Sequence, residues 1–328
     1  MRPFAYERAA DVAGALDLAG GGNGAHYLAG GTNLVDLMKL EVETPTLLVD
    51  IRGLAEDAIE DTPDGGLRIG ALVTNSDLAV DPRVRERYPL LAQALLSGAS
   101  GQLRNMATVA GNLLQRTRCA YFQDISKPCN KRAPGSGCPA REGAHRDLAV
   151  LGRSEACVAT HPSDMAVAMV AIGGEVHVLG REGARTVTLG GLHRLPGDEP
   201  QRDTVLEPGD LITAIELSPL PFAARSRYRK VRDRASFAFA LTSIAAAVDL
   251  QDGVVRDCRI AFGGLAHAPW RAPRAEEALR GTPATEASFA AAADAELAHA
   301  RPLRDNAFKV PLARNVLVRT LNELCEMA

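Results

Sequence analysis

The chain has 328 residues, which is long for a single hydrophobic core and typical of two or three domains. Hydrophobic residues make up 46% and charged residues 23%, the composition of an ordinary globular protein. The net charge of −3 and the aromatic content of 4% argue against a nucleic-acid partner, which would usually require a basic surface or stacking aromatic side chains.

The N-terminal residues do not resemble a secretory signal. Charged side chains stand where a signal would need an apolar stretch, at Arg2, Glu7, Arg8, Asp11 and Asp17. No apolar run approaches the roughly 20 residues that cross a bilayer. We therefore expect synthesis in the cytoplasm and no membrane partner, with export to the periplasm only as a passenger on a partner that carries its own signal.

Apolar spacing predicts mixed structure along the first two thirds of the chain. We expect a helix over 9–20, a strand ending in the glycine turn HYLAGG, a helix opened by Thr32 and Asn33 as N-cap residues, and the buried strand TLLVDI. The next predicted elements are a strand and a capped helix in LRIGALVTNSDL and one helix over RERYPLLAQALLSGA. We then expect a helix in DMAVAMVAIG, a hairpin formed by EVHVLG and RTVTLGGL, and a strand in EPGDLITAIEL.

Two other regions have a distinct character. Residues 115–155 are polar and without periodicity, and a loop this long inside a compact domain is usually functional. The proline-rich stretch SPLPFAARS predicts a domain boundary. Beyond it, two strand candidates, RYRKVRD and DCRIAFGGL, and long alanine-rich helices predict a small α+β domain with helices on one face.

Two segments favour the binding of a phosphate-bearing ligand. In AGGTNLVDLMK, Gly30 and Gly31 allow backbone amides to approach an anion, and a helix N-terminus follows; the alternative is a plain tight turn before a capped helix. In SGASGQLRNMATVAGNLLQRT, closely spaced hydroxyl and amide side chains suit phosphate, ribose and a flavin edge, whereas the alternative is a polar loop between helices. Neither segment matches a dinucleotide fingerprint or a phosphate loop.

Four of the six cysteines are close together in the sequence. Cys119, Cys129, Cys138 and Cys157 have 9, 8 and 18 residues between them. Four thiolates can bind a zinc ion or a four-iron cluster, and this spacing does not choose between the two. Nearby cations that could offset a cluster's negative charge, and a turn over 134–137 that frees backbone amides, favour iron and sulfur. The cations are Arg116, Arg118, Lys127, Lys131 and Arg132.

Isolated residues receive simpler interpretations. Cys258 and Cys325 are expected to be core thiols, and His161 is expected to be a loop histidine rather than a ligand. Asp164 has two interpretations, as the N-cap of the helix DMAVAMVAI or as an acceptor for a ribose hydroxyl. The sequence contains no nucleophile elbow, no HExxH motif and no pair of catalytic carboxylates.

Taken together, these residues resemble the FAD subunit of the xanthine dehydrogenase family of molybdenum hydroxylases, over nearly the whole chain. AGGTNLVDLMK is similar to the family's first flavin loop, and QLRNMATVAGNL to its second, Q-x-R-N-x-A-T-x-G-G-N. RKVRDRASFAFALTSIAAAV and FGGLAHAPWRA are similar to parts of the C-terminal domain. Ala110 departs from the pattern, because the family usually has a glycine there.

The cysteine-containing segment resembles that of the flavin subunits of periplasmic aldehyde oxidoreductases, a branch in which this subunit carries a four-iron cluster. The flavin subunit of 4-hydroxybenzoyl-CoA reductase also has such an insertion, but its surrounding sequence is less similar. The resemblance implies that Cys119, Cys129, Cys138 and Cys157 bind a [4Fe-4S] cluster.

The resemblance also implies a fold and a set of FAD-binding residues. The expected fold class is α+β: a two-lobed FAD-binding domain of the vanillyl-alcohol-oxidase (PCMH) type over 1–220, with lobes 1–55 and 56–220 and the insertion 115–157, then a small α+β C-terminal domain over 224–328. The implied FAD-binding residues are His26, Tyr27, Leu28, Ala29, Gly30, Gly31, Thr32, Asn33, Leu34, Ala99, Thr108, Gly111, Asn112, Asp164, Leu211 and Lys230.

The implied function is electron transfer within a heterotrimer. A large subunit with a molybdenum cofactor oxidises an aldehyde to a carboxylate, a small subunit passes the electrons through two [2Fe-2S] clusters, and FAD in this chain delivers them to an external acceptor. No residue of this chain is expected to be catalytic. The alternatives are a related enzyme acting on an aromatic acyl-CoA or a purine, a stand-alone flavin oxidase, and a zinc-stapled binding module.

Overall fold

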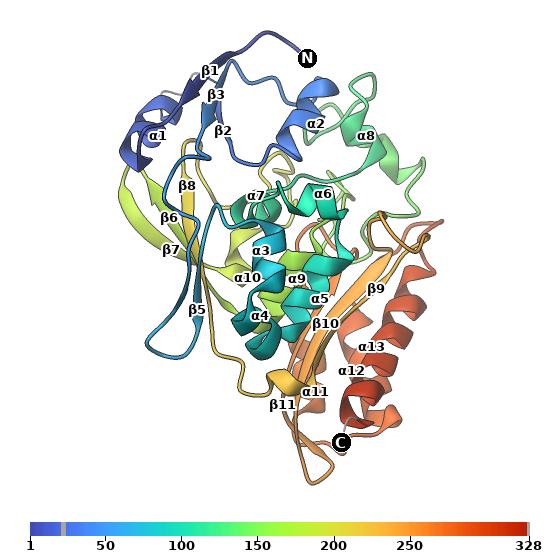
Figure 1. Cartoon of the computed structure of the whole chain (residues 1–328). Coiled ribbons are helices and arrows are strands. Elements are labelled where there is room, and N and C mark those ends of the chain that lie inside the picture. Colours follow the sequence, from blue (N-terminus) through green and yellow to red (C-terminus); the bar gives the residue numbers. More distant parts are fainter. Residues whose placement is uncertain (21–23, 327–328) are drawn as a thin grey trace.

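The computed structural model describes residues 1–20 and 24–326. The last two residues of the predicted C-terminal domain therefore lie outside the described residues. Three sheets with their helices follow one another in the fold: a small N-terminal sheet, a larger central sheet and a C-terminal sheet backed by long helices (Figure 1). Within the described ranges, no helix is both long and apolar enough to cross a membrane.

The N-terminal sheet has three parallel strands in the order β1-β3-β2. Helices connect its strands, as parallel pairing requires. The elements are β1 (Ala5–Arg8), α1 (Val12–Ala19), β2 (Ala25–Leu28), α2 (Leu34–Lys39) and β3 (Leu47–Asp50). The predicted helices and strands are present, but Asn33 does not cap α2 through its side chain. Its Oδ1 instead accepts a hydrogen bond from the backbone N–H of Arg116, at 2.9 Å.

The central sheet is antiparallel, with strand order β4-β5-β8-β6-β7. Its strands are β4 (Ile59–Asp61), β5 (Leu67–Gly70), β6 (Gly174–Gly180), β7 (Gly183–Thr188) and β8 (Leu211–Leu217). The accompanying helices are α3 (Asn75–Val80), α4 (Pro82–Arg87), α5 (Pro89–Ser97), α6 (Gly101–Arg104), α7 (Val109–Leu113), α9 (Asp164–Ile172) and α10 (Leu189–Leu192). Every residue of α9 is buried, so this helix forms the centre of the molecule.

The single helix predicted over RERYPLLAQALLSGA is wrong in one respect. The chain leaves the helical conformation at Tyr88, where φ is −141° and ψ is 52°, and α5 starts at Pro89. Proline disfavours a helical conformation in the residue before it and lacks the N–H that would continue the helix. Two short helices, α4 and α5, therefore replace one.

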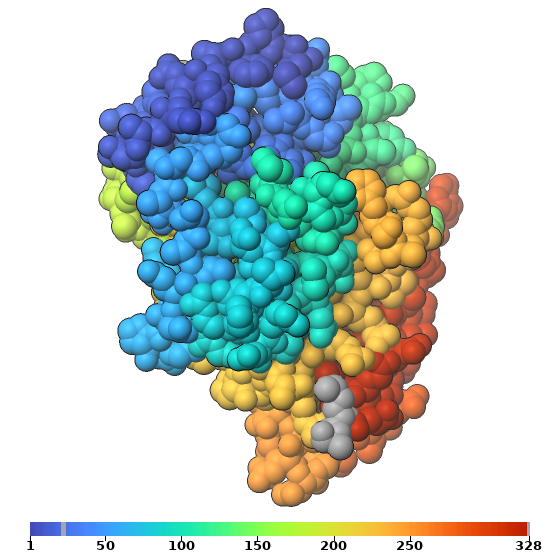
Figure 2. Space-filling model, in the orientation of Figure 1, coloured from blue at the N-terminus to red at the C-terminus, as the bar shows by residue number. Residues whose placement is uncertain are grey.

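Residues 115–157 contain only α8 (Ala120–Gln123) and the single 3-10 turn η1 (Pro139–Arg141), as the lack of periodicity predicted. The segment nevertheless has its own apolar core, to which Phe122, Ala140 and Val158 contribute together with Leu37 from α2. It adjoins the N-terminal part of the chain on the outside of the molecule, where green and blue atoms meet (Figure 2).

The C-terminal sheet is antiparallel, in the order β12-β11-β10-β9, and three helices lie on one face. The elements are η2 (Ala223–Arg225), β9 (Ser226–Val231), β10 (Thr242–Gln251), β11 (Val254–Gly263), β12 (Trp270–Arg271), α11 (Pro273–Leu279), α12 (Glu286–Leu297) and α13 (Lys309–Glu326). The prediction of only two strands here is wrong. The ten-residue β10 is rich in alanine, which favours a helix locally, but its burial between β9 and β11 makes it one of the sheet's two inner strands.

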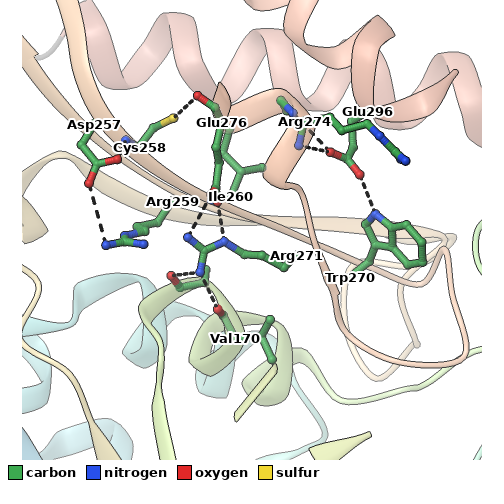
Figure 3. Close-up of polar contacts among 12 residues, drawn as sticks. Val170, Asp257, Cys258, Arg259, Ile260, Trp270, Arg271, Arg274, Glu276 and Glu296 are labelled. Carbon is green, nitrogen blue, oxygen red and sulfur yellow. Dashed lines mark hydrogen bonds and ion pairs between the residues drawn. The ribbon is translucent and has the colours of Figure 1, made fainter. Parts of the chain in front are cut away.

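One arginine of the C-terminal sheet binds the end of α9 (Figure 3). Nη1 of Arg271 donates to the carbonyls of Val170 and Ala171 at 3.1 and 3.3 Å, at the end of α9 where a cation is favoured. Its Nε and Nη2 contact the buried carboxylate of Glu276 on α11, and that carboxylate also accepts from the N–H of Ile260 at 2.7 Å. The guanidinium therefore ties the central helix to the C-terminal domain.

Candidate functional site

The first glycine loop follows β2 and requires its glycines for two different reasons. Gly31 has φ of +70°, in the left-handed region that favours glycine. At Gly30 a Cβ would lie 1.7 Å from the carbonyl oxygen of Met106. Because that carbonyl belongs to the second predicted loop, Gly30 allows the two loops to pack backbone against backbone.

The second loop is held by hydrogen bonds from both sides. Thr108 caps α7, its hydroxyl accepting from the N–H of Gly111 at 3.3 Å. The N–H of Ala110 donates to the Ala71 carbonyl at 3.1 Å, which fixes the loop against the end of β5. The side-chain oxygen of Asn112 accepts from the hydroxyl of Ser163 at 2.6 Å. Ala110, the departure from the family pattern, lines a cavity here.

Two cavities meet at these loops and share Gly31, Thr32, Asn33 and Gly111 in their walls. The first measures about 660 Å³ and the second about 560 Å³. Residues 26–34, Thr108, Gly111 and Leu211 line the first; Ala99, Asn112, Asp164 and Lys230 line the second. The structure thus brings every predicted FAD-binding residue to one of two adjoining cavities.

Asn33 stands where the two cavities meet. Its side-chain oxygen accepts from Arg116, but its buried Nδ2 has no hydrogen-bond partner among the described residues. A buried donor without a partner costs free energy that a ligand oxygen would recover. A polar ligand that spans the two cavities would therefore meet an available amide at this point.

Asp164 begins α9 but is not its N-cap, so that interpretation is wrong. The cap is Ser163, whose hydroxyl accepts from the N–H of Ala166 at 2.9 Å. Two side chains of β9 reach the Asp164 carboxylate instead: Lys230 Nζ donates at 2.7 Å, and the buried hydroxyl of Tyr228 also donates. Burial, with the Asp164 charge adding to it, raises the pKa of Tyr228 well above its ordinary value. The C-terminal domain therefore orients this carboxylate at the second cavity.

Several wall residues were not predicted as FAD-binding. In the first cavity, Arg116 pairs with Glu43. In the second, the aromatic rings of Phe237 and Phe239 come from the β9–β10 loop, and Phe237 is strained at φ of +49°. The two phenylalanines lie within a segment that resembles the family. The resemblance did not indicate that they line this cavity. Glu43 belongs to no sequence motif that would have marked it as a site residue.

The four clustered cysteines line one small pocket in segment 115–157. Burial raises the pKa of the Cys119, Cys138 and Cys157 thiols, that of Cys157 to about 12. Backbone N–H groups oppose this effect: those of Tyr121 and Phe122 at Cys119, those of Ala140, Arg141 and Val158 at Cys138, and that of Ala159 at Cys157. Amides directed at sulfur stabilise thiolates and are typical of iron–sulfur sites.

Two details of the cysteine prediction are wrong. Within turn 134–137, the Gly137 amide donates to the side chain of Asn130 and the Ser136 amide to a carbonyl, because the turn folds back on its own loop. Of the five nearby cations, only Lys131 lines the pocket. The others do not, since Arg116 and Arg118 pair with distant carboxylates, Arg132 donates to backbone carbonyls and Lys127 is exposed.

Across residues 1–20 and 24–326, no three His, Cys, Asp or Glu side chains converge on a position for a single metal ion. The zinc interpretation, which requires four ligands at about 2.3 Å from one ion, gains no support from this arrangement.

Two glycine loops that pack on each other across adjoining cavities define a nucleotide-binding protein with a composite site, and comparison with known proteins gives its family. Residues 2–221 match the FAD binding domain in molybdopterin dehydrogenase, and residues 226–324 match the CO dehydrogenase flavoprotein C-terminal domain. The chain therefore belongs to the FAD-binding subunits of the xanthine dehydrogenase family of molybdenum hydroxylases, and it is an oxidoreductase subunit.

Individual relatives agree with this assignment. The chain is 53% identical to the aldehyde oxidoreductase FAD-binding subunit PaoB of Escherichia coli, over 98% of both chains. It is 26% identical to the carbon monoxide dehydrogenase medium chain of Hydrogenophaga pseudoflava, over 97% of this chain and 96% of that one. A solved structure of carbon monoxide dehydrogenase from that organism superposes with a TM-score of 0.76, at 27% identity, over 98% and 96% of the two chains. The expected family resemblance is confirmed.

Proposed function

We propose that FAD spans both cavities, with its diphosphate at the two glycine loops. The resemblance implies that residues 26–34 hold the diphosphate region, that Ala99, Thr108, Gly111 and Asn112 line the flavin cleft, and that Asp164 reaches the adenosine ribose. Leu211 would contact FAD in the first cavity and Lys230 in the second. The Nδ2 of Asn33, which has no partner among the described residues, would donate a hydrogen bond to a diphosphate oxygen where the cavities meet. This supports the placement of the diphosphate. A lysine-oriented carboxylate suits a ribose hydroxyl, which donates hydrogen bonds to it.

We further propose the fold type and domain limits that the resemblance implies: a two-lobed FAD domain of the vanillyl-alcohol-oxidase type over 1–220, with the insertion 115–157, and a C-terminal domain over 224–328. Separate parallel and antiparallel sheets, one before and one after residue 55, support two lobes. The family matches over 2–221 and 226–324 support a boundary near residue 222.

We propose that Cys119, Cys129, Cys138 and Cys157 hold a [4Fe-4S] cluster. The shared pocket and the backbone amides that act on three of the sulfurs support this proposal. The enclosed space is only about 10 Å³. Loading a cluster would therefore require the thiol side chains and the loop around them to move outward.

As a complex, this chain would receive electrons and pass them on. The proposed partners are a large subunit with a molybdenum cofactor that oxidises an aldehyde and a small subunit with [2Fe-2S] clusters, and FAD here would reduce an external acceptor. The 53% identity to an aldehyde oxidoreductase subunit favours an aldehyde over an acyl-CoA or a purine. The complex would be assembled in the cytoplasm, and this chain would reach the periplasm only with a partner.

The stand-alone oxidase is less well supported, because it needs a base beside the flavin. The two carboxylates that line the first cavity, Glu43 and Asp210, are each paired with an arginine, Arg116 and Arg185. Each carboxylate already accepts a hydrogen bond from its arginine.

The test compares the isolated chain with the native complex. Both should show a flavin absorption spectrum, but an aromatic aldehyde should bleach the flavin only in the complex. Bleaching of the isolated chain by aldehyde at the rate of the complex would contradict the proposal and favour a stand-alone oxidase.

A further inference from the structure

A partly buried series of ion pairs joins the first cavity to the cysteine pocket. Arg116, in the wall of the first cavity, donates through Nε to Asp203 Oδ2 at 2.9 Å and pairs with Glu43 through Nη1. The other oxygen of Asp203 contacts Nζ of Lys131, which lines the cysteine pocket. One carboxylate thus connects two cations that face different sites.

Lys131 is held by three acceptors. Its side chain is 1% exposed, and Nζ contacts Asp203, the Pro200 carbonyl at 2.7 Å and Nε2 of His267 at 2.7 Å. Since Nδ1 of His267 lies 3.0 Å from the Arg194 carbonyl, that nitrogen carries the proton and Nε2 accepts from the ammonium. A buried ammonium is stable only when paired and fully hydrogen-bonded, so this arrangement fixes a positive charge in place.

The charge acts on the cysteine side. Lys131 follows Cys129 by two positions, and its buried ammonium group lines the same pocket as the four thiols. Asp203 limits this action, because its one negative charge is paired with both Lys131 and Arg116. Burial would raise the pKa of Asp203, yet Lys131 and Arg116 hold it well below its ordinary value. The two cations and their shared carboxylate therefore form one electrostatic unit.

We propose that Lys131 is a positioning residue that makes the potential of the iron–sulfur group more positive, and that Asp203 balances this charge against Arg116 at the flavin. The inference rests on the proposed cluster. A fixed cation beside a cluster stabilises its more negative, reduced form, and local charge is one of the factors that set cluster potentials. Through Asp203, a change at either site alters the field at the other.

The experiment measures cluster and flavin midpoint potentials in the native complex, by redox titration followed by EPR and absorption, after iron and sulfide have been quantified. K131M removes the buried charge and K131R keeps it. K127M makes the same change at an exposed lysine of the same loop. D203N removes the balancing carboxylate and tests the proposal in the opposite direction.

We expect the cluster potential to become more negative in K131M, to return toward the wild-type value in K131R and to stay at that value in K127M. In D203N both the cluster and the flavin potentials should become more positive. A K131M potential equal to that of K127M overturns the inference. If K131M loses its iron, D203N decides: a positive shift supports the inference and an unchanged potential overturns it. Wild-type complex whose iron and sulfide do not exceed the amounts in the [2Fe-2S] clusters of the small subunit would instead contradict the proposed cluster itself.

Discussion

Gly30 offers a sharp test of how the two flavin loops are built. Its φ is not in the left-handed region, so alanine is compatible with the backbone conformation there. The obstacle to G30A is contact alone, because the new Cβ would lie 1.7 Å from the Met106 carbonyl oxygen. That atom belongs to backbone, which cannot rotate away as a flexible side chain would.

The size of the effect follows from this distance. Ordinary contact begins near 3.4 Å, so the loops would have to separate by about 1.7 Å at this point. Overpacking of this kind costs about 1–3 kcal/mol. If the separation is taken up in the FAD cleft, the same free energy raises the FAD Kd about 5-fold to about 100-fold, since about 1.4 kcal/mol corresponds to tenfold.

The assay is titration of the flavin-free protein with FAD, followed by the quenching of flavin fluorescence. G53A is the matched control, because a Cβ at Gly53 would meet nothing within 4 Å. We expect G53A to bind FAD like the wild type and G30A to bind it more weakly. An unchanged FAD Kd in G30A would refute the argument that loop-to-loop contact shapes the site.

Three further variants test other parts of the structure. K230M should weaken FAD binding about tenfold, because Asp164 loses the cation that orients its carboxylate at the second cavity; an unchanged Kd in the same titration would count against that role. R271M should lower the free energy of unfolding by about 3 kcal/mol in urea denaturation, since the buried carboxylate of Glu276 loses its partner, and a loss below about 0.5 kcal/mol would contradict this. Burial lowers the pKa of His267 from 6.5 to about 4, so the unfolded chain binds more protons between these values and stability falls as the pH drops from about 6.5 to about 4. H267N should flatten this part of the stability–pH curve, and an equal slope in both proteins would show that another group is responsible.

Local chemistry made the glycine loops predictable from the sequence. The left-handed turn at Gly31 and the cap at Thr108 depend only on residues a few positions away. Such features can therefore be predicted from the local sequence. The alanine-rich strand β10 was harder to predict from the sequence, because its strand conformation depends on the neighbours β9 and β11 rather than on its own residues. The break at Tyr88 was readable from Pro89, although periodicity across it suggested one helix.

Contacts between segments that are far apart in the sequence could not be predicted from it. Lys131 meets Asp203 across 72 positions and His267 across 136, and no motif marks either partner. The cations near the cysteines illustrate the same limit, since five of them are close in sequence but only Lys131 of the five lines the pocket. Which charges act on a site is decided by tertiary packing.

The most direct test of the central claim is the cofactor content of the purified native complex, measured as FAD released on denaturation and as iron and acid-labile sulfide bound to this chain. We expect one FAD per chain and, if the proposed cluster is present, four irons and four sulfides as well. A chain free of flavin and iron, and unable to take up either on reconstitution, would contradict it.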